Sequence, residues 1–138
     1  MRVSVIITSY NQKEPLQGAI ESVLAQTRMP DEIVIADDCS QDGSQELIRS
    51  YVAENPGLIK PVFQDRNVGI PRNKNAAYRA TTCEYVTYLD GDDLFRPEKI
   101  EVDLDMLEAN PEADIACGNV AYLDSEGRKV GTWCEDED

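Results

Sequence analysis

The stretch "VSVIITS", Val3 to Ser9, decides the fold of this chain. Most of its residues are β-branched, and the apolar ones, two Val and two Ile, are interrupted only by Ser4. An almost continuous apolar run of this kind is typical of a strand buried on both faces of a parallel sheet, because a strand with one wet face alternates apolar and polar residues. The stretch therefore predicts a buried strand in a mainly parallel sheet.

The sequence on the C-terminal side of this strand changes period. Apolar residues recur at helical spacing and form one stripe, which ends near Pro30: Leu16, Ala19, Ile20, Val23 and Leu24. "EIVIAD", Glu32 to Asp37, predicts a second strand, and a second helical stripe follows and ends at "NPG", residues 55–57. "LIKPVFQ", Leu58 to Gln64, predicts a third strand at an edge of the sheet, because Pro61 has no N–H to donate to a strand partner.

The rest of the chain continues the alternation. A loop and a short helix precede "EYVTYLD", Glu84 to Asp90, which predicts the fourth strand. Pro97 with Glu98 is expected to open another helix, and residues 113–133 are expected to form a fifth strand and a hairpin that turns at "DSEG". Alternating strands and helices predict an α/β fold, a doubly wound and mainly parallel sheet with helices on both faces, with strands 3, 2, 1 and 4 side by side.

Composition limits the classes of function. The chain has 138 residues, 41% of them hydrophobic, which predicts a single domain over residues 1–138. Its formal net charge is −14, so a nucleic-acid partner is not expected. Four scattered cysteines and no histidine argue against a zinc site, and no apolar run approaches the ~20 residues of a membrane span. We expect a cytoplasmic protein without a membrane span, or one that is membrane-associated within a longer protein.

Polar residues follow three of the predicted strands. They are "TSYN" (residues 8–11), "DDCS" (residues 37–40) and "DGDD" (residues 90–93). Because ligands of such sheets bind beyond the carboxyl ends of the strands, where the winding direction reverses, these three segments predict one binding rim.

Each segment offers a distinct chemistry at this rim. Tyr10 has a flat face on which a base can stack, and Thr8 has a hydroxyl. Ionised Asp38 accepts hydrogen bonds from a ring N–H or from ribose hydroxyls. Asp90 and Asp92 supply hard oxygen ligands, which favour Mg²⁺ or Mn²⁺ bound together with substrate phosphates. The repulsion among three carboxylates in "DGDD" would then be offset by a divalent cation that carries a diphosphate.

The loop after the third strand adds two cations. Arg72 and Lys74 could steady the same phosphates, although each alone would be an ordinary solvated side chain.

Other interpretations of these segments were weighed. Asp37 and Asp38, taken alone, are as compatible with a helix N-cap and a solvated neighbour as with a ligand site. Neither the dinucleotide motif G-x-G-x-x-G nor the phosphate loop G-x-x-x-x-G-K-[ST] is present. "DCSQDG" begins like a calcium loop, but Arg49 stands where a bidentate Glu is required.

Four blocks of the sequence resemble family 2 glycosyltransferases, which have the GT-A fold. They are "VSVIITSYN", "EIVIADDCSQDGS", "NVGIPRNKNAA" and "YVTYLDGDDLFRPEKI", in the family's order and spacing and over nearly the whole chain. The resemblance implies that this chain is the N-terminal, nucleotide-sugar-binding portion, and that the acceptor-binding portion is absent.

The resemblance also implies roles for individual residues. Thr8 and Tyr10 would lie in the nucleotide pocket, and Asp38 would contact the base. Lys74 stands where the family usually has Arg, with Arg72 as an alternative for that contact. "DGDD" matches the family's D-x-D motif.

In that motif, Asp90 would approach the ribose and Asp92 the metal. The implied donor is a nucleotide-diphosphate sugar, most simply a UDP-sugar, and the implied acceptor a hydroxyl of a polysaccharide, a lipid-linked glycan or a protein glycan.

The implied reaction is an inverting transfer with a divalent metal, Mn²⁺ or Mg²⁺, and a carboxylate base. No residue here is assigned as that base, the acidic tail "EDED" (residues 135–138) included, so the chain is expected to be part of a longer enzyme. Two alternatives stay open: a nucleotide-binding or interaction module without turnover, and, ranked lower, a haloacid-dehalogenase-like phosphatase with Asp90 as nucleophile and Asp92 as acid.

Overall fold

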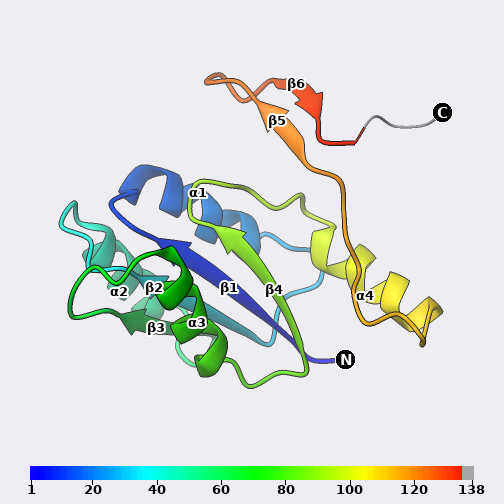
Figure 1. Ribbon diagram of the computed structural model, residues 1–138, viewed down its shortest axis with the longest axis horizontal. Helices are drawn as coiled ribbons and strands as arrows, with labels where there is room; N and C mark the ends of the chain where they lie inside the picture. The colour runs from blue at the N-terminus through cyan, green and yellow to red at the C-terminus, as the bar shows by residue number, and fades with distance from the viewer. Residues whose placement is uncertain (135–138) are drawn as a thin grey trace. The chain divides into compact units, whose positions relative to one another are not determined.

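The computed structural model describes residues 1–134 (Figure 1). The chain divides into a first unit, Met1–Glu101, and a second unit that begins at Val102. Six elements precede the last strand of the first unit: β1 Val3–Ser9, α1 Lys13–Leu24, β2 Glu32–Asp37, α2 Ser44–Glu54, β3 Ile59–Phe63 and α3 Ile70–Ala80. They are followed by β4 Tyr85–Asp90, α4 Lys99–Ala109, β5 Ala121–Leu123 and β6 Lys129–Thr132.

The first unit contains a parallel four-stranded sheet in the order β3-β2-β1-β4. This order confirms the prediction from Pro61, because β3 pairs only with β2 among the described strands. β1 lies between β2 and β4, and all but one of its residues are buried. The prediction of a central strand buried on both faces is therefore confirmed.

Helices cover both faces of this sheet, as Figure 1 shows for α3 on one face and for α1 and α2 on the other. On the α3 face, Ala77 packs against Ile6, Val34 and Ala36, all fully buried. The apolar stripe of α1, with Leu16 and Ile20 fully buried, belongs to the opposite layer. The doubly wound α/β class is therefore confirmed, and the small side chain of Ala77 lets α3 lie close to the strands that carry the polar rim.

Two details of the sequence-based fold are wrong. Residues 113–120 form no strand, and β5 and β6 pair only with each other, as an antiparallel hairpin, among the described strands. The hairpin turn itself is at Asp124–Gly127, as expected, with the Gly127 N–H donating to the Asp124 carbonyl at 2.9 Å. α4 begins at Lys99 rather than at Pro97, because Arg96 to Glu98 form a turn whose Arg96 carbonyl accepts the Lys99 N–H at 3.0 Å.

Three further expectations concern the whole chain. In the described part, no helix is long and apolar enough to cross a membrane. All four cysteines are free thiols. The acidic tail lies outside the described residues, and the single domain over residues 1–138 stays a prediction.

Candidate functional site

The carboxyl ends of β2, β1 and β4 lie side by side and form the predicted rim. Ser9 is paired in register with Asp37 of β2, and Thr8 with Asp90 of β4. The three polar segments that follow these strands therefore leave the sheet at the same edge, as the sequence predicted.

The acidic turn Asp90–Asp93 is fixed against β1. The Gly91 N–H donates to the Thr8 carbonyl at 2.9 Å, and the Asp93 N–H donates to the Asp90 carbonyl at 3.0 Å. A Cβ on Gly91 would lie 2.7 Å from the Thr8 carbonyl oxygen, closer than side-chain carbons come to a backbone oxygen. Glycine is therefore required here by the close approach of the turn to the strand.

Lys74 of α3 offsets part of the negative charge of this turn. Its Nζ lies 3.4 Å from Asp90 Oδ1 and 3.9 Å from the centroid of the Tyr88 ring. The Thr8 hydroxyl donates to the same Asp90 oxygen at 3.3 Å. The structure thus brings Thr8, Lys74 and Asp90 together, and it adds Tyr88, which the sequence did not indicate as a site residue.

The remaining charge of the turn belongs to Asp92 and Asp93, which are both exposed. Partial burial, and then the negative charges of Asp92 and Asp90, raise the pKa of Asp93 above its ordinary value. Among residues 1–134, no three His, Cys, Asp or Glu side chains are grouped so that they could hold a metal ion. Mg²⁺ or Mn²⁺ usually binds one or two protein carboxylates when substrate phosphates complete its coordination. The carboxylates of Asp92 and Asp93 therefore fit such an ion.

Asp38 lies beneath the rim and fastens the loop that leads into α3. It is only 3% exposed, and its two carboxylate oxygens accept the N–H groups of Val68 at 2.7 Å and of Gly69 at 2.9 Å. Gly69 has φ 86° and ψ 160°, a conformation that favours glycine. Each carboxylate oxygen keeps a second lone pair, but the known partners of Asp38 are backbone groups.

Tyr10 follows β1 and is 47% exposed. The next residue, Asn11, is hydrogen-bonded across the rim: its N–H donates to the Ser40 hydroxyl at 2.9 Å, and its Oδ1 accepts the Gln41 N–H at 2.8 Å. The sequence analysis did not select Asn11 as a site residue. The clue was its position directly after "TSY", but a hydrogen bond between residues 29 positions apart has no local sequence signature.

Asp37 and Asp38 are not helix caps. α2 begins at Ser44 after Gly43, and the side chain that accepts the Ser44 N–H is Asp42, at 3.0 Å. Asp37 is fully buried, so the solvated neighbour of that interpretation is also absent from the pair.

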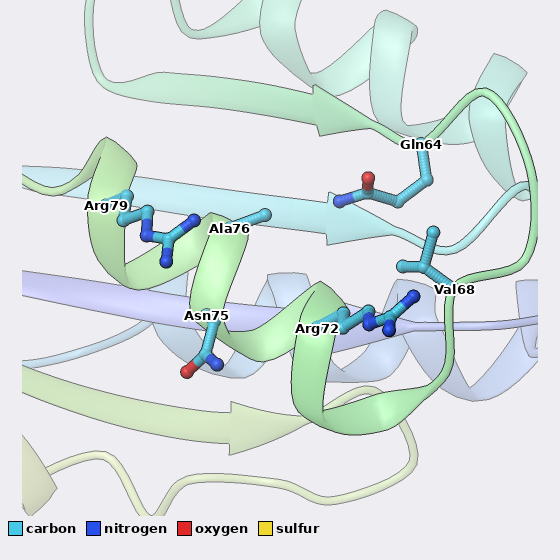
Figure 2. Close-up of a pocket in the computed structure, with 6 residues that line it drawn as sticks. All are labelled: Gln64, Val68, Arg72, Asn75, Ala76 and Arg79. Carbon is cyan, nitrogen blue, oxygen red and sulfur yellow. The ribbon is translucent and has the colours of Figure 1, made fainter.

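Arg72 lies on a different side of α3 from Lys74. Figure 2 shows its guanidinium extending toward Val68, in a groove of about 410 Å³ lined also by Gln64, Asn75, Ala76 and Arg79. Lys74, in contrast, lies at Asp90. The structure therefore brings Lys74, and not Arg72, to the acidic turn.

Comparisons with known proteins agree with this geometry. Residues 4–135 match the family described as glycosyl transferase family 2. An uncharacterized glycosyltransferase of Nostoc sp. (strain PCC 7120) is 39% identical over 130 residues, which cover 90% of this chain and 40% of that protein. The chain thus spans about two fifths of the length of this curated relative.

Two solved structures share the fold. TarS of S. aureus, residues 1–349 in complex with UDP, matches with a TM-score of 0.72 and 26% identity, over 80% of this chain and 33% of that one. A mannosyltransferase from Pyrobaculum calidifontis, in complex with GDP-Man and Mn²⁺, matches with a TM-score of 0.71 and 26% identity, over 88% of this chain and 35% of that one. With a doubly wound sheet, the acidic turn on its rim and a family match over nearly the whole sequence, the chain belongs to glycosyl transferase family 2.

Proposed function

We propose that this chain is the donor-binding part of a glycosyltransferase that uses a nucleotide-diphosphate sugar and a divalent cation. The observation that carries the proposal is that the Thr8 hydroxyl and the Lys74 ammonium both contact Oδ1 of Asp90, beside the exposed residue Asp92. The solved relatives support it, since their titles name UDP in one case and GDP-Man with Mn²⁺ in the other.

Different rim residues bind different parts of the nucleotide. Tyr10 offers a stacking face for the base, and Asp38 can accept a hydrogen bond from the base through an unused lone pair. Asp90 accepts hydrogen bonds from the ribose. We propose UDP as the first nucleotide to test, because a UDP complex exists for one relative.

Lys74 is the cation we assign to the diphosphate. Its ammonium is held between Asp90 and the Tyr88 ring, and a quarter of its side chain is exposed, so it can turn toward an incoming phosphate. Lys makes a point-charge contact where the family usually has the two-pronged contact of Arg. We assign Arg72 to the neighbouring groove on α3, where Figure 2 shows its guanidinium extending toward Val68.

Asp92 is the residue we assign to the metal, Mn²⁺ or Mg²⁺. When bound, the cation would neutralise the charge of the departing nucleoside diphosphate. Burial and the charges of its neighbours raise the pKa of Asp93. A cation at this turn would lower that pKa, because it favours the ionised carboxylate.

The reaction we propose is an inverting transfer. An acceptor oxygen forms a bond to the anomeric carbon, the bond from that carbon to the diphosphate oxygen breaks, and the acceptor proton goes to a carboxylate base. The rim carboxylates are already assigned to binding the donor, so we propose that the base and the acceptor site belong to a longer protein. We propose that this longer protein is cytoplasmic or membrane-associated.

The test is a calorimetric titration of the 138-residue chain with UDP, in Mn²⁺ and in EDTA. We expect binding that depends on the metal in the wild type and loses this dependence in Asp92→Ala. Glu54→Ala is the matched control, because it removes an exposed carboxylate at the C-terminal end of α2, at the end of the helix away from the rim. UDP binding that is independent of metal and unchanged in Asp92→Ala would refute the assignment.

The alternatives give different outcomes in related assays. Metal-dependent UDP binding with no sugar transfer, even in a longer chain, would indicate a binding module without turnover. Full transfer activity from residues 1–138 would refute the proposal that the base lies elsewhere. Phosphatase turnover that disappears in Asp90→Asn would favour the haloacid-dehalogenase-like alternative.

A further inference from the structure

The two loops that carry Tyr10 and Asp38 are hydrogen-bonded to each other. We call residues 10–12, between β1 and α1, the first rim loop, and residues 38–43, between β2 and α2, the second rim loop. Asn11 exchanges two hydrogen bonds with the second loop, one as donor to Ser40 and one as acceptor from Gln41. The second loop is also bonded to the start of α1, where the Lys13 N–H donates to Asp42 Oδ2 at 2.9 Å.

Both loops contain a residue with a left-handed backbone. Asn11 has φ 50° and Cys39 has φ 63°, and within residues 1–134 these are the non-glycine residues with positive φ. Among non-glycine residues, Asn adopts this conformation most readily, because its short polar side chain can bond locally. Position 11 therefore needs two properties at once, tolerance of positive φ and a side-chain acceptor for the Gln41 N–H.

A buried carboxylate sets the direction of the bonds beneath the loops. Asp37 is fully buried, its Oδ2 accepts the Ser40 N–H at 2.9 Å, and its Oδ1 accepts the Ser40 hydroxyl. The Ser40 hydroxyl thus donates its one proton to Asp37 and accepts from the Asn11 N–H through an oxygen lone pair. Asp37, Ser40 and Asn11 thus form a chain of oriented hydrogen bonds that leads from the core to the residue after Tyr10.

Tyr10 is therefore fixed on both sides along the chain. Ser9 before it is part of β1 and is 3% exposed, and Asn11 after it is bonded to the second rim loop, whereas the Tyr10 ring itself is half exposed. An aromatic ring whose backbone is already ordered loses less conformational entropy when a ligand stacks on it.

We propose that Asn11 and Ser40 are positioning residues that hold Tyr10 in place as a platform for the base of the nucleotide. The inference rests on the proposed function, and it adds residues that make no contact with the ligand. It implies that their loss weakens the contribution of the base to affinity and leaves the contribution of the diphosphate unchanged.

The experiment compares two ligands, UDP and inorganic pyrophosphate, each with Mn²⁺, by calorimetry on the 138-residue chain. Asn11→Gly keeps the tolerance of positive φ and removes the acceptor, and Asn11→Asp keeps both. We expect Asn11→Gly to weaken UDP binding about tenfold, within the ~1–3 kcal/mol that stacking a base on an aromatic ring contributes, with pyrophosphate affinity unchanged. Asn11→Asp is expected to stay close to the wild type.

A double-mutant cycle links this loss to the ring. Tyr10→Ala is expected to cause a loss of similar size, and Tyr10→Ala with Asn11→Gly no further loss, because a missing platform cannot be mispositioned. Ser40→Ala is the second variant. It removes the acceptor of the Asn11 N–H together with the hydroxyl that donates to Asp37, and it is expected to give the same selective loss.

The outcomes that overturn the inference differ from those that overturn the proposed function. If the wild type binds no UDP, the proposed function fails and the positioning role fails with it. If the wild type binds UDP and Asn11→Gly binds it equally well, the inference alone is refuted. Additive losses in the cycle, or an equal loss of pyrophosphate affinity, would also refute it.

Discussion

Replacing Gly91 by alanine is the sharpest steric perturbation of the rim. The added Cβ would lie 2.7 Å from the Thr8 carbonyl oxygen, whereas carbon and carbonyl oxygen are comfortable at about 3.3 Å or more, so the acidic turn must move by about 0.6 Å. The same oxygen accepts the Gly91 N–H at 2.9 Å, and the displacement weakens that bond. Overpacking costs about 1–3 kcal/mol and a lost hydrogen bond about 1 kcal/mol, which predicts a destabilisation of roughly 2–4 kcal/mol.

Two assays measure the effect. In thermal unfolding, the Tm of Gly91→Ala is expected to be lower by roughly 8–16 °C, since 1 kcal/mol corresponds to about 4 °C in a domain of this size. UDP affinity with Mn²⁺, measured well below that Tm, is expected to fall more than about tenfold, because the 3.4 Å contact of Lys74 with Asp90 stretches as the turn moves.

Gly57→Ala is the matched control. Gly57 has φ 84°, but an added Cβ would meet no atom within 4 Å, so its cost is backbone strain of about 1–2 kcal/mol without displacement of the turn. UDP affinity should then equal that of the wild type. If Gly91→Ala is no less stable than Gly57→Ala and binds UDP normally, the reasoning from the close approach of Gly91 to Thr8 is wrong.

Two further predictions concern the charges at the turn. Lys74→Met should weaken UDP binding about tenfold and Arg72→Met by less than about twofold in the same titration, because only Lys74 lies at Asp90; equal losses would show that both cations contact the phosphates. For Asp93, burial first and then the charges of Asp92 and Asp90 raise the pKa, so the folded state keeps a proton that the unfolded chain releases near pH 3.9. The free energy of unfolding therefore falls as pH rises from about 3.9 through the folded-state pKa of Asp93, and Asp93→Asn should lack this fall when thermal unfolding is compared from pH 3.5 to pH 7. A difference between wild type and variant that does not change with pH would contradict the shift.

The order of the sheet could be predicted from the sequence because one edge position and the winding rules of βαβ units leave few alternatives. The β-branched, largely apolar run Val3–Ser9 indicated a strand covered on both faces, and Pro61 indicated that β3 lies at an edge. The rim follows from this order, since parallel strands end at the same edge. The pattern of residues 113–120 wrongly indicated a strand. A short segment with apolar residues can be interpreted as a strand even when the fold offers no partner strand.

The partners of the rim residues could not be predicted, because they depend on contacts between distant segments. The segment "DDCS" predicts that Asp38 binds the ligand, but its oxygens accept hydrogen bonds from the backbone of Val68 and Gly69, some 30 positions away. The difference between Lys74 and Arg72 is one of helix geometry: residues two apart face opposite sides of α3. Asn11 was overlooked because its importance comes from a left-handed backbone and from Ser40, and neither is visible in composition or periodicity.

The central claim is that a nucleoside diphosphate and a divalent cation bind at the carboxyl edge of β1 and β4. The most direct measurement is the NMR spectrum of the labelled chain with UDP, before and after substoichiometric Mn²⁺, which broadens the amide signals nearest to it. The strands span about 20 Å, so the two ends of the sheet are distinguishable. We predict selective broadening of Gly91, Asp92 and Thr8, with the signals of Val3 and Tyr85 at the opposite end retained. Uniform broadening, or broadening that is the same without UDP and in Asp92→Ala, would contradict the account.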